Sequence, residues 1–158
     1  MGDKGAAAGL HQHARGKARS VAQLGGLHRP VLGVDTAVAI GGAILGKPAN
    51  AAEAAGMLER LSGKTHVVVS GVCLLTPAWE VVEHAVTSVA FRELTPREQA
   101  QHLAQGEWEG RAGGYAIQGR GAALVERIEG DYLNVVGLPA ALLVKLLAER
   151  FPGAYGLG

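Results

Sequence analysis

The fold depends on the stretch Val31-Leu32-Gly33-Val34-Asp35-Thr36-Ala37-Val38-Ala39-Ile40. Its density of Val, Leu and Ile predicts a strand that is buried on both faces. Asp35 interrupts this strand, and an ionised carboxylate is costly in an apolar interior unless it is paired, bound to a metal or open to solvent. Asp35 therefore either lies at the mouth of a cleft or caps a local turn through its own backbone.

The size and composition of the chain predict one domain with an aliphatic core. The chain has 158 residues, of which 48% are hydrophobic and 4% aromatic, and one core serves a chain of this size. The net charge is +1, so no overall field favours nucleic acid or a membrane surface as a partner. Cys73 has no second cysteine to pair with, and we expect it to be a small buried hydrophobe. Residues 1–30 lack the apolar core of a signal peptide and no apolar run is long enough to span a membrane, so we expect a cytoplasmic protein.

Strands and helices alternate along the rest of the chain, which predicts an α/β fold. Gly41-Gly42 predicts a hairpin, and the two clearest helix starts follow the capping residues Asn50 and Thr95. We expect strands at 43–45, 65–75, 79–92 and 122–128, and helices at 14–24, 51–62, 96–105 and 139–150. Residues 14–150 then form a single domain, with a disordered start at 1–13 and a frayed tail at 151–158.

The segment from Gly106 to Gly121 predicts a functional loop. It is too long and too rich in glycine for a simple turn, and its backbone N–H groups can approach an anion closely. We expect Gly119-Arg120-Gly121 to open a strand, so the segment carries neither a Walker pattern nor a dinucleotide-binding fingerprint.

Several isolated basic residues are candidates for a functional role. Lys47 lies between a strand end and Pro48, which would hold its ammonium near the start of the next helix. Lys17 is on the polar side of a predicted helix, where a solvent-exposed role is the ordinary alternative. His11 and His13 could bind a metal, but histidines near an exposed terminus are usually solvated.

Several short blocks occur in a fixed order between about residue 14 and residue 150. They are Asp35-Thr36, Gly46-Lys47-Pro48, Met57-Leu58, Leu61-Ser62-Gly63-Lys64-Thr65-His66, Gly106-Glu107, Ala112-Gly113-Gly114-Tyr115-Ala116-Ile117-Gln118-Gly119, Ile128-Glu129-Gly130-Asp131-Tyr132 and Asn134-Val135-Val136-Gly137-Leu138-Pro139. In order and spacing these blocks resemble the Maf family of nucleoside triphosphate pyrophosphatases.

The resemblance implies a mixed central sheet flanked by helices, similar to the fold of Maf proteins and inosine triphosphatases. It also implies a house-cleaning enzyme that hydrolyses the α-β phosphoanhydride of a nucleoside triphosphate with a divalent metal, Mg or Mn. The Ile117-Gln118-Gly119 version of the loop looks like the branch that accepts dTTP and UTP. Members similar to this chain are often homodimers, and the resemblance implies neither a nucleic acid nor a membrane partner.

The resemblance also assigns roles to individual residues. Asp35 matches the acid that accepts a proton from the attacking water and contacts the metal. Thr36 and Gln118 fall on positions associated with substrate choice, and the amide of Gln118 offers a donor and an acceptor suited to the imide edge of uracil or thymine. Lys17 and Lys47 match lysines that face the phosphates.

The chain departs from the family pattern in two places. Family members usually begin with an apolar strand and a Ser-x-Ser-Pro-Arg-Arg-like turn that grips the phosphates, followed by a glutamate that helps to hold the metal. Residues 1–13 do not resemble that region, so we expect the domain to be N-terminally incomplete. Where the family often has an Asp-Lys pair, this chain has Gly110-Arg111, and Arg111 keeps the positive charge and offers a fork for phosphate. The alternative function is a non-catalytic nucleotide-binding or regulatory module linked to septum formation.

Overall fold

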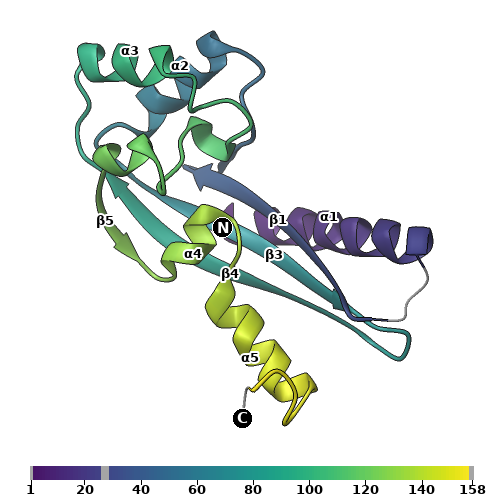
Figure 1. Ribbon diagram of the computed structural model, residues 1–158. Helices are drawn as coiled ribbons and strands as arrows, with labels where there is room; N and C mark the ends of the chain where they lie inside the picture. Colours follow the sequence, from purple (N-terminus) through teal and green to yellow (C-terminus); the bar gives the residue numbers. More distant parts are fainter. Residues whose placement is uncertain (1, 26–28, 157–158) are drawn as a thin grey trace.

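The centre of the molecule is a five-stranded sheet (Figure 1), seen in a computed structural model that describes residues 2–25 and 29–156. The strands are β1 (Val31–Ile40), β2 (Ala43–Leu45), β3 (Thr65–Leu75), β4 (Glu80–Phe91) and β5 (Val125–Glu129), in the order β2-β1-β3-β4-β5. The predicted α/β class is confirmed. Each strand pair in the described residues is antiparallel, however, so the sheet is not mixed. Tight turns join β1 to β2 and β3 to β4. A short hairpin of this kind can connect only antiparallel strands, because parallel strands need a long crossover connection.

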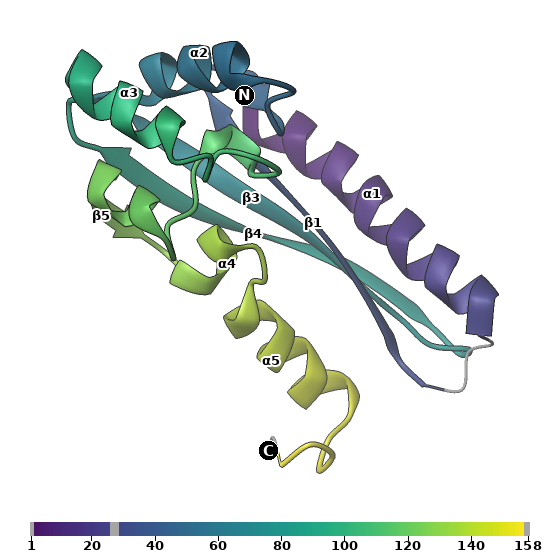
Figure 2. The same cartoon turned by 45° about the horizontal axis from the view of Figure 1, so that its top comes forward.

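One helix, α1 (Gly2–Gly25), lies along one face of the sheet beside β1 and β3 (Figures 1 and 2). The predicted disordered start is therefore wrong for residues 2–13, and the helix predicted at 14–24 is only the second half of α1. The residues that α1 buries recur every three or four positions, and they are Ala7, Leu10, Ala14, Ala18 and Ala22. Four of these five side chains are alanines, so α1 contacts the sheet through small residues.

Two glycines on the sheet allow this close contact. A Cβ at Gly71 of β3 would lie 2.6 Å from the carbonyl oxygen of Leu10, and a Cβ at Gly33 of β1 would lie 2.9 Å from the backbone nitrogen of Ala18. Both distances are shorter than van der Waals contact, so a larger residue at either position would displace the helix.

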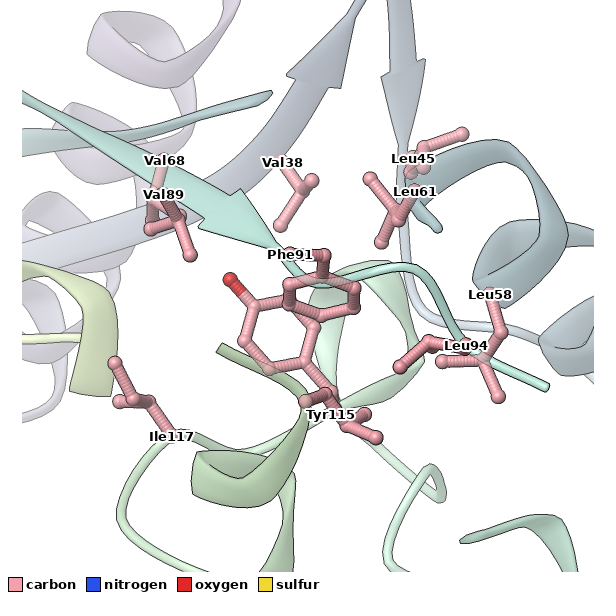
Figure 3. Packing of buried hydrophobic residues seen from close by; sticks show 11 residues of the cluster. Val38, Leu45, Leu58, Leu61, Val68, Val89, Phe91, Leu94, Tyr115 and Ile117 are labelled. Carbon is pink, nitrogen blue, oxygen red and sulfur yellow. The ribbon is translucent and has the colours of Figure 1, made fainter. Parts of the chain in front are cut away.

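The main hydrophobic core lies on the other face of the sheet (Figure 3). Helices α2 (Ala51–Leu61) and α3 (Pro96–Ala104) contribute side chains to this core, and both begin at their predicted caps. Asn50 accepts a hydrogen bond from the N–H of Glu53 at 2.9 Å, and Thr95 forms a capping box with Glu98. The buried members of this core are Val38, Leu45, Leu58, Leu61, Val68, Val89, Phe91, Leu94, Tyr115, Ile117 and Leu124.

The C-terminal third differs from the prediction in detail. Arg120–Leu124 is a 3₁₀ helix that precedes β5, so Gly119-Arg120-Gly121 opens a helical turn and the predicted strand at 122–128 begins late. A short helix, α4 (Tyr132–Val136), was not predicted, and α5 (Ala140–Arg150) matches the predicted last helix closely.

The last described residues, 151–156, form turns rather than a frayed tail. The ring of Phe151 lies 5.4 Å from that of Trp79, measured between centroids. Among the described residues, no helix is long and apolar enough to cross a membrane.

Candidate functional site

A cavity of about 250 Å³ opens beside β1, at the edge of the sheet. The short strand β2 pairs with residues 38–40 of β1, and no other described strand pairs with the outer edge of residues 31–37. Six residues that the sequence singled out line this cavity, and they are Lys17, Asp35, Thr36, Lys47, Arg111 and Gln118. They come from α1, from β1, from the segment after β2 and from the loop after α3, so the fold brings distant parts of the chain to one place.

The carboxylate of Asp35 is held by two side chains of α1. Lys17 donates from Nζ to Oδ1 at 2.6 Å, and Nδ1 of His13 lies 3.0 Å from Oδ2. Lys17 also donates to the carbonyl oxygen of Val34 at 2.9 Å. Among the described residues, the hydrogen bonds of Asp35 go to these side chains and not to its own backbone. The turn-capping interpretation is therefore wrong, and Asp35 lies at the mouth of a cleft with 24% of its side chain exposed.

The contact of His13 with Asp35 was not predicted. His13 precedes Lys17 by four residues, which puts both on one face of a helix. This spacing predicts that the two side chains lie together, but only if the helix is known to include residue 13. His11 faces His84 of β4, with ring nitrogens 3.2 Å apart. Within the described residues no three His, Cys, Asp or Glu side chains gather as a metal cluster, so neither His11 nor His13 belongs to one.

The side chain of Thr36 points to the face of β1 opposite to that of Asp35, because successive side chains alternate along a strand. Its hydroxyl lies 2.7 Å from that of Ser70 on β3. A second cavity, of about 270 Å³, opens on the α1 side and is lined by Leu10, His13 and Ala37 as well as by Asp35 and Thr36. The Asp35-Thr36 pair is therefore accessible from both faces of the sheet edge.

The predicted functional loop forms the far wall of the first cavity. Its Arg111 and Gln118 are exposed, and between them the chain turns through a 3₁₀ segment at Ala112–Gly114. Gly113 has a φ of 71°, a conformation that favours glycine, and its N–H donates to the carbonyl oxygen of Gly46 at 3.1 Å. This bond connects the loop to the segment that carries Lys47.

The cavity has a charged end and an apolar wall. Three cations and one carboxylate line it, a balance that favours a polyanionic ligand. The apolar wall can lie against a flat ring, and it consists of Val34, Val38, Val68, Ala112, Tyr115, Ala116, Val135 and Val136.

The donor set fits a hard divalent cation that shares its coordination with a ligand. Asp35 supplies one carboxylate, and Mg²⁺ is often bound through one or two carboxylates together with phosphate oxygens and water. Gly110 leaves no carboxylate at its position, so Asp35 is the acidic side chain that the described cavity wall offers.

The fold defines an α/β protein whose cavity combines a cationic end with an apolar wall. A family model described as Maf-like protein matches residues 3–150. Together with the relatives below, this match shows that the chain belongs to the Maf family, as the resemblance indicated.

Three curated relatives are each named dTTP/UTP pyrophosphatase. The one from Deinococcus radiodurans is 48% identical over 127 residues, which cover 80% of this chain and 65% of that protein. The one from Pyrococcus furiosus is 49% identical over 118 residues, covering 74% and 62%, and the one from Moorella thermoacetica is 50% identical over 144 residues, covering 90% and 74%. The chain thus spans between about three fifths and three quarters of the length of these relatives.

Proposed function

We propose that this chain hydrolyses a nucleoside triphosphate of the dTTP or UTP type to the monophosphate and pyrophosphate. The observation that supports this most directly is the common cavity, which is lined by a carboxylate at a strand edge and by three cations from separate elements. The names of the relatives, dTTP/UTP pyrophosphatase, agree with it.

The charged end of the cavity would bind the triphosphate. Lys47 and Arg111 lack ion-pair partners among the described acidic groups, so both are available to phosphate oxygens, and Arg111 can make a two-pronged contact. Lys17 is already paired with Asp35 and would act on both the carboxylate and the phosphates. Cleavage builds negative charge on the leaving pyrophosphate, and fixed cations in a partly dry site stabilise that charge.

Asp35 would accept the proton of the attacking water. The water oxygen forms a bond to the α-phosphorus, the bond from that phosphorus to the bridging oxygen breaks, and the electron pair leaves with pyrophosphate. Lys17 and His13 fix the direction of the carboxylate while each oxygen keeps a further lone pair for the proton. A divalent metal, Mg or Mn, would contact Asp35 and phosphate oxygens, and it would supply charge neutralisation and a more acidic water.

Thr36 and Gln118 would set the choice of base. Gln118 is exposed on the loop and offers an amide donor and acceptor, which match the N–H and carbonyl of a uracil or thymine edge. The hydroxyl of Thr36 is oriented by Ser70 toward the same cavity. The nucleotide is the proposed partner, and a cytoplasmic homodimer remains our proposal for the assembly and compartment.

Release of pyrophosphate from UTP, dTTP, CTP and 7-methyl-GTP, each with Mg²⁺ or Mn²⁺, tests the proposal. We expect UTP and dTTP to be hydrolysed faster than the other two. Lys47→Met should raise KM for UTP about tenfold or more, because it removes one charge from the phosphate end. Lys145→Met is the matched control, since Lys145 is an exposed lysine of α5 outside the cavity.

Calorimetric titration with UTP separates the two candidate functions. Turnover that depends on Lys47 and not on Lys145 supports the pyrophosphatase. Tight binding without turnover of any of the four nucleotides would overturn it in favour of the non-catalytic nucleotide-binding module. If the chain neither binds nor hydrolyses any of the nucleotides, both functions are excluded for it.

A further inference from the structure

The loop that carries Arg111 and Gln118 is anchored to the sheet at its midpoint by Tyr115. Regular structure in this loop is limited to short 3₁₀ turns, so the positions of its two exposed side chains depend on what fixes the backbone between them. Tyr115 lies four residues after Arg111 and three before Gln118, and it is 5% exposed.

Tyr115 reaches from the loop into the core and meets His66 of β3. Its hydroxyl oxygen lies 2.7 Å from Nε2 of His66. Both rings pack edge-on against Phe91, with centroid distances of 4.8 Å for Tyr115 and 5.0 Å for His66. Figure 3 shows the Tyr115 ring beside Phe91 with its hydroxyl directed toward Val89.

This hydrogen bond joins two neutral groups in an apolar interior. Burial lowers the pKa of His66 to about 4, and burial also raises the pKa of the Tyr115 phenol, so both are uncharged near neutral pH. His66 is 2% exposed and its Nδ1 has no hydrogen-bond partner among the described residues. Its polar connection therefore runs through Nε2 to Tyr115, and a buried bond of this kind is costly to break.

Three other polar contacts hold the loop by its backbone. The N–H of Gly113 donates to Gly46, Nε2 of His102 lies 3.0 Å from the carbonyl oxygen of Gly114, and the N–H of Gly121 donates to Glu107 at 3.2 Å. Tyr115 differs from these residues because its side chain both enters the core and lines the cavity.

We propose that Tyr115, held by His66, is a positioning residue that fixes Arg111 and Gln118 on the cavity wall and thereby sets nucleotide affinity and base selectivity. This inference rests on the proposed function. It assigns no chemical step to either residue, since both act through the loop.

The test compares four single variants and one double variant with the parent chain. Tyr115→Phe removes the hydroxyl and keeps the ring. His66→Leu removes the partner, whereas His66→Gln keeps an amide that can bond the hydroxyl. Tyr132→Phe is the control, because Tyr132 is an exposed tyrosine whose hydroxyl makes no hydrogen bond with the described residues.

Steady-state hydrolysis of UTP and CTP with Mg²⁺ provides the first readout. We expect Tyr115→Phe and His66→Leu to raise KM for UTP about five- to tenfold, with a smaller change in kcat, and to narrow the preference for UTP over CTP. His66→Gln should restore part of the affinity and selectivity. Tyr132→Phe should match the parent.

Amide hydrogen exchange of residues 111–118 provides a second readout that needs no nucleotide. We expect exchange there to accelerate in Tyr115→Phe and His66→Leu and to stay at the parent rate in Tyr132→Phe. The double variant Tyr115→Phe with His66→Leu should be more stable than either single variant, because no buried polar group is then left without its partner. Its preference for UTP over CTP should stay low.

Each result decides the inference. Faster exchange with higher KM and lower selectivity supports it. Faster exchange with parent-like KM and selectivity would make the pair purely structural and overturn it, as would parent-like behaviour in both readouts. If the parent chain itself neither binds nor hydrolyses UTP, the proposed function is overturned and the inference falls with it. This outcome is distinguishable from failure of the inference alone, because it is seen in the parent chain without any variant.

Discussion

Replacement of Gly71 by alanine should lift α1 from the sheet and disturb Asp35. Gly71 lies directly across from Asp35 in the β1-β3 register, and its added Cβ would stand 2.6 Å from the carbonyl oxygen of Leu10 and 3.1 Å from the nitrogen of His11. Ordinary contact between carbon and oxygen is above 3 Å, so the helix must move by roughly 0.5–1 Å. Its backbone cannot yield as a flexible side chain would.

Two consequences follow from that displacement. Overpacking of this kind costs about 1–3 kcal/mol of stability. The bond of 2.6 Å from Lys17 to Asp35 and that of 3.0 Å from His13 lengthen together, because both residues belong to the displaced helix. A misplacement near 1 Å can lower catalysis about a hundredfold, so we expect kcat for UTP to fall by at least tenfold.

Urea unfolding and UTP turnover measure the two effects separately. Gly16→Ala is the matched control, since Gly16 belongs to α1 and a Cβ there has no atom within 4 Å. This variant should keep full activity and gain up to about 1 kcal/mol of stability, because alanine has a higher helix propensity than glycine. If Gly71→Ala were as stable and as active as the parent, the close contact of α1 with β3 would not be what positions Asp35.

Three further predictions concern single side chains. Asp35→Asn should lower kcat for UTP by about 10²–10⁴ while calorimetry shows binding within a few fold of the parent, because the base is lost and the phosphate-binding cations remain; parent-like turnover would contradict that role. The pKa of His66 is about 4 in the folded state, against an ordinary value of 6.5 that applies to the unfolded state. The unfolded state therefore takes up the proton first as the pH falls. The free energy of unfolding measured in urea should drop by on the order of 3 kcal/mol between about pH 6.5 and pH 4. His66→Gln should remove that pH dependence, and a profile equal to the parent's would refute the assignment. Glu80 pairs with Arg15 at 2.6 Å and Arg19 at 3.1 Å, and Glu80→Gln should cost about 1 kcal/mol, most of it absent in 1 M salt.

The sequence predicted those elements whose local and tertiary preferences agree. β1 and β3 are dense in β-branched and aliphatic residues, and α2 and α3 begin at caps that their side chains form in the structure. α1 was predicted only in part because its buried face consists mainly of alanine, which gives a weak hydrophobic signal. The helix is stabilised by its fit to the glycines of two strands, and such a fit is a tertiary property.

The sequence named the residues that line the cavity, but it did not predict the contacts between them. Four of the six residues that the structure brings to one cavity lie in the family blocks, and Lys17 and Arg111 were compared with the family outside them, whereas the partners of Asp35 depend on where α1 lies. His13 was judged solvated because no fold had been assigned to residues 1–13. The roles of Thr36, Gln118 and the three cations remain predictions that the assays above address.

The contact of Lys17 with the carbonyl oxygen of Val34 also affects the outer edge of β1, which pairs with no other described strand over residues 31–37. An unpaired strand edge can recruit a strand from another molecule and so begin aggregation. Here an ammonium covers one acceptor of that edge, so an incoming strand would have to displace a charged group before it could pair. The lysine that orients the carboxylate thus also protects the sheet from unwanted strand addition.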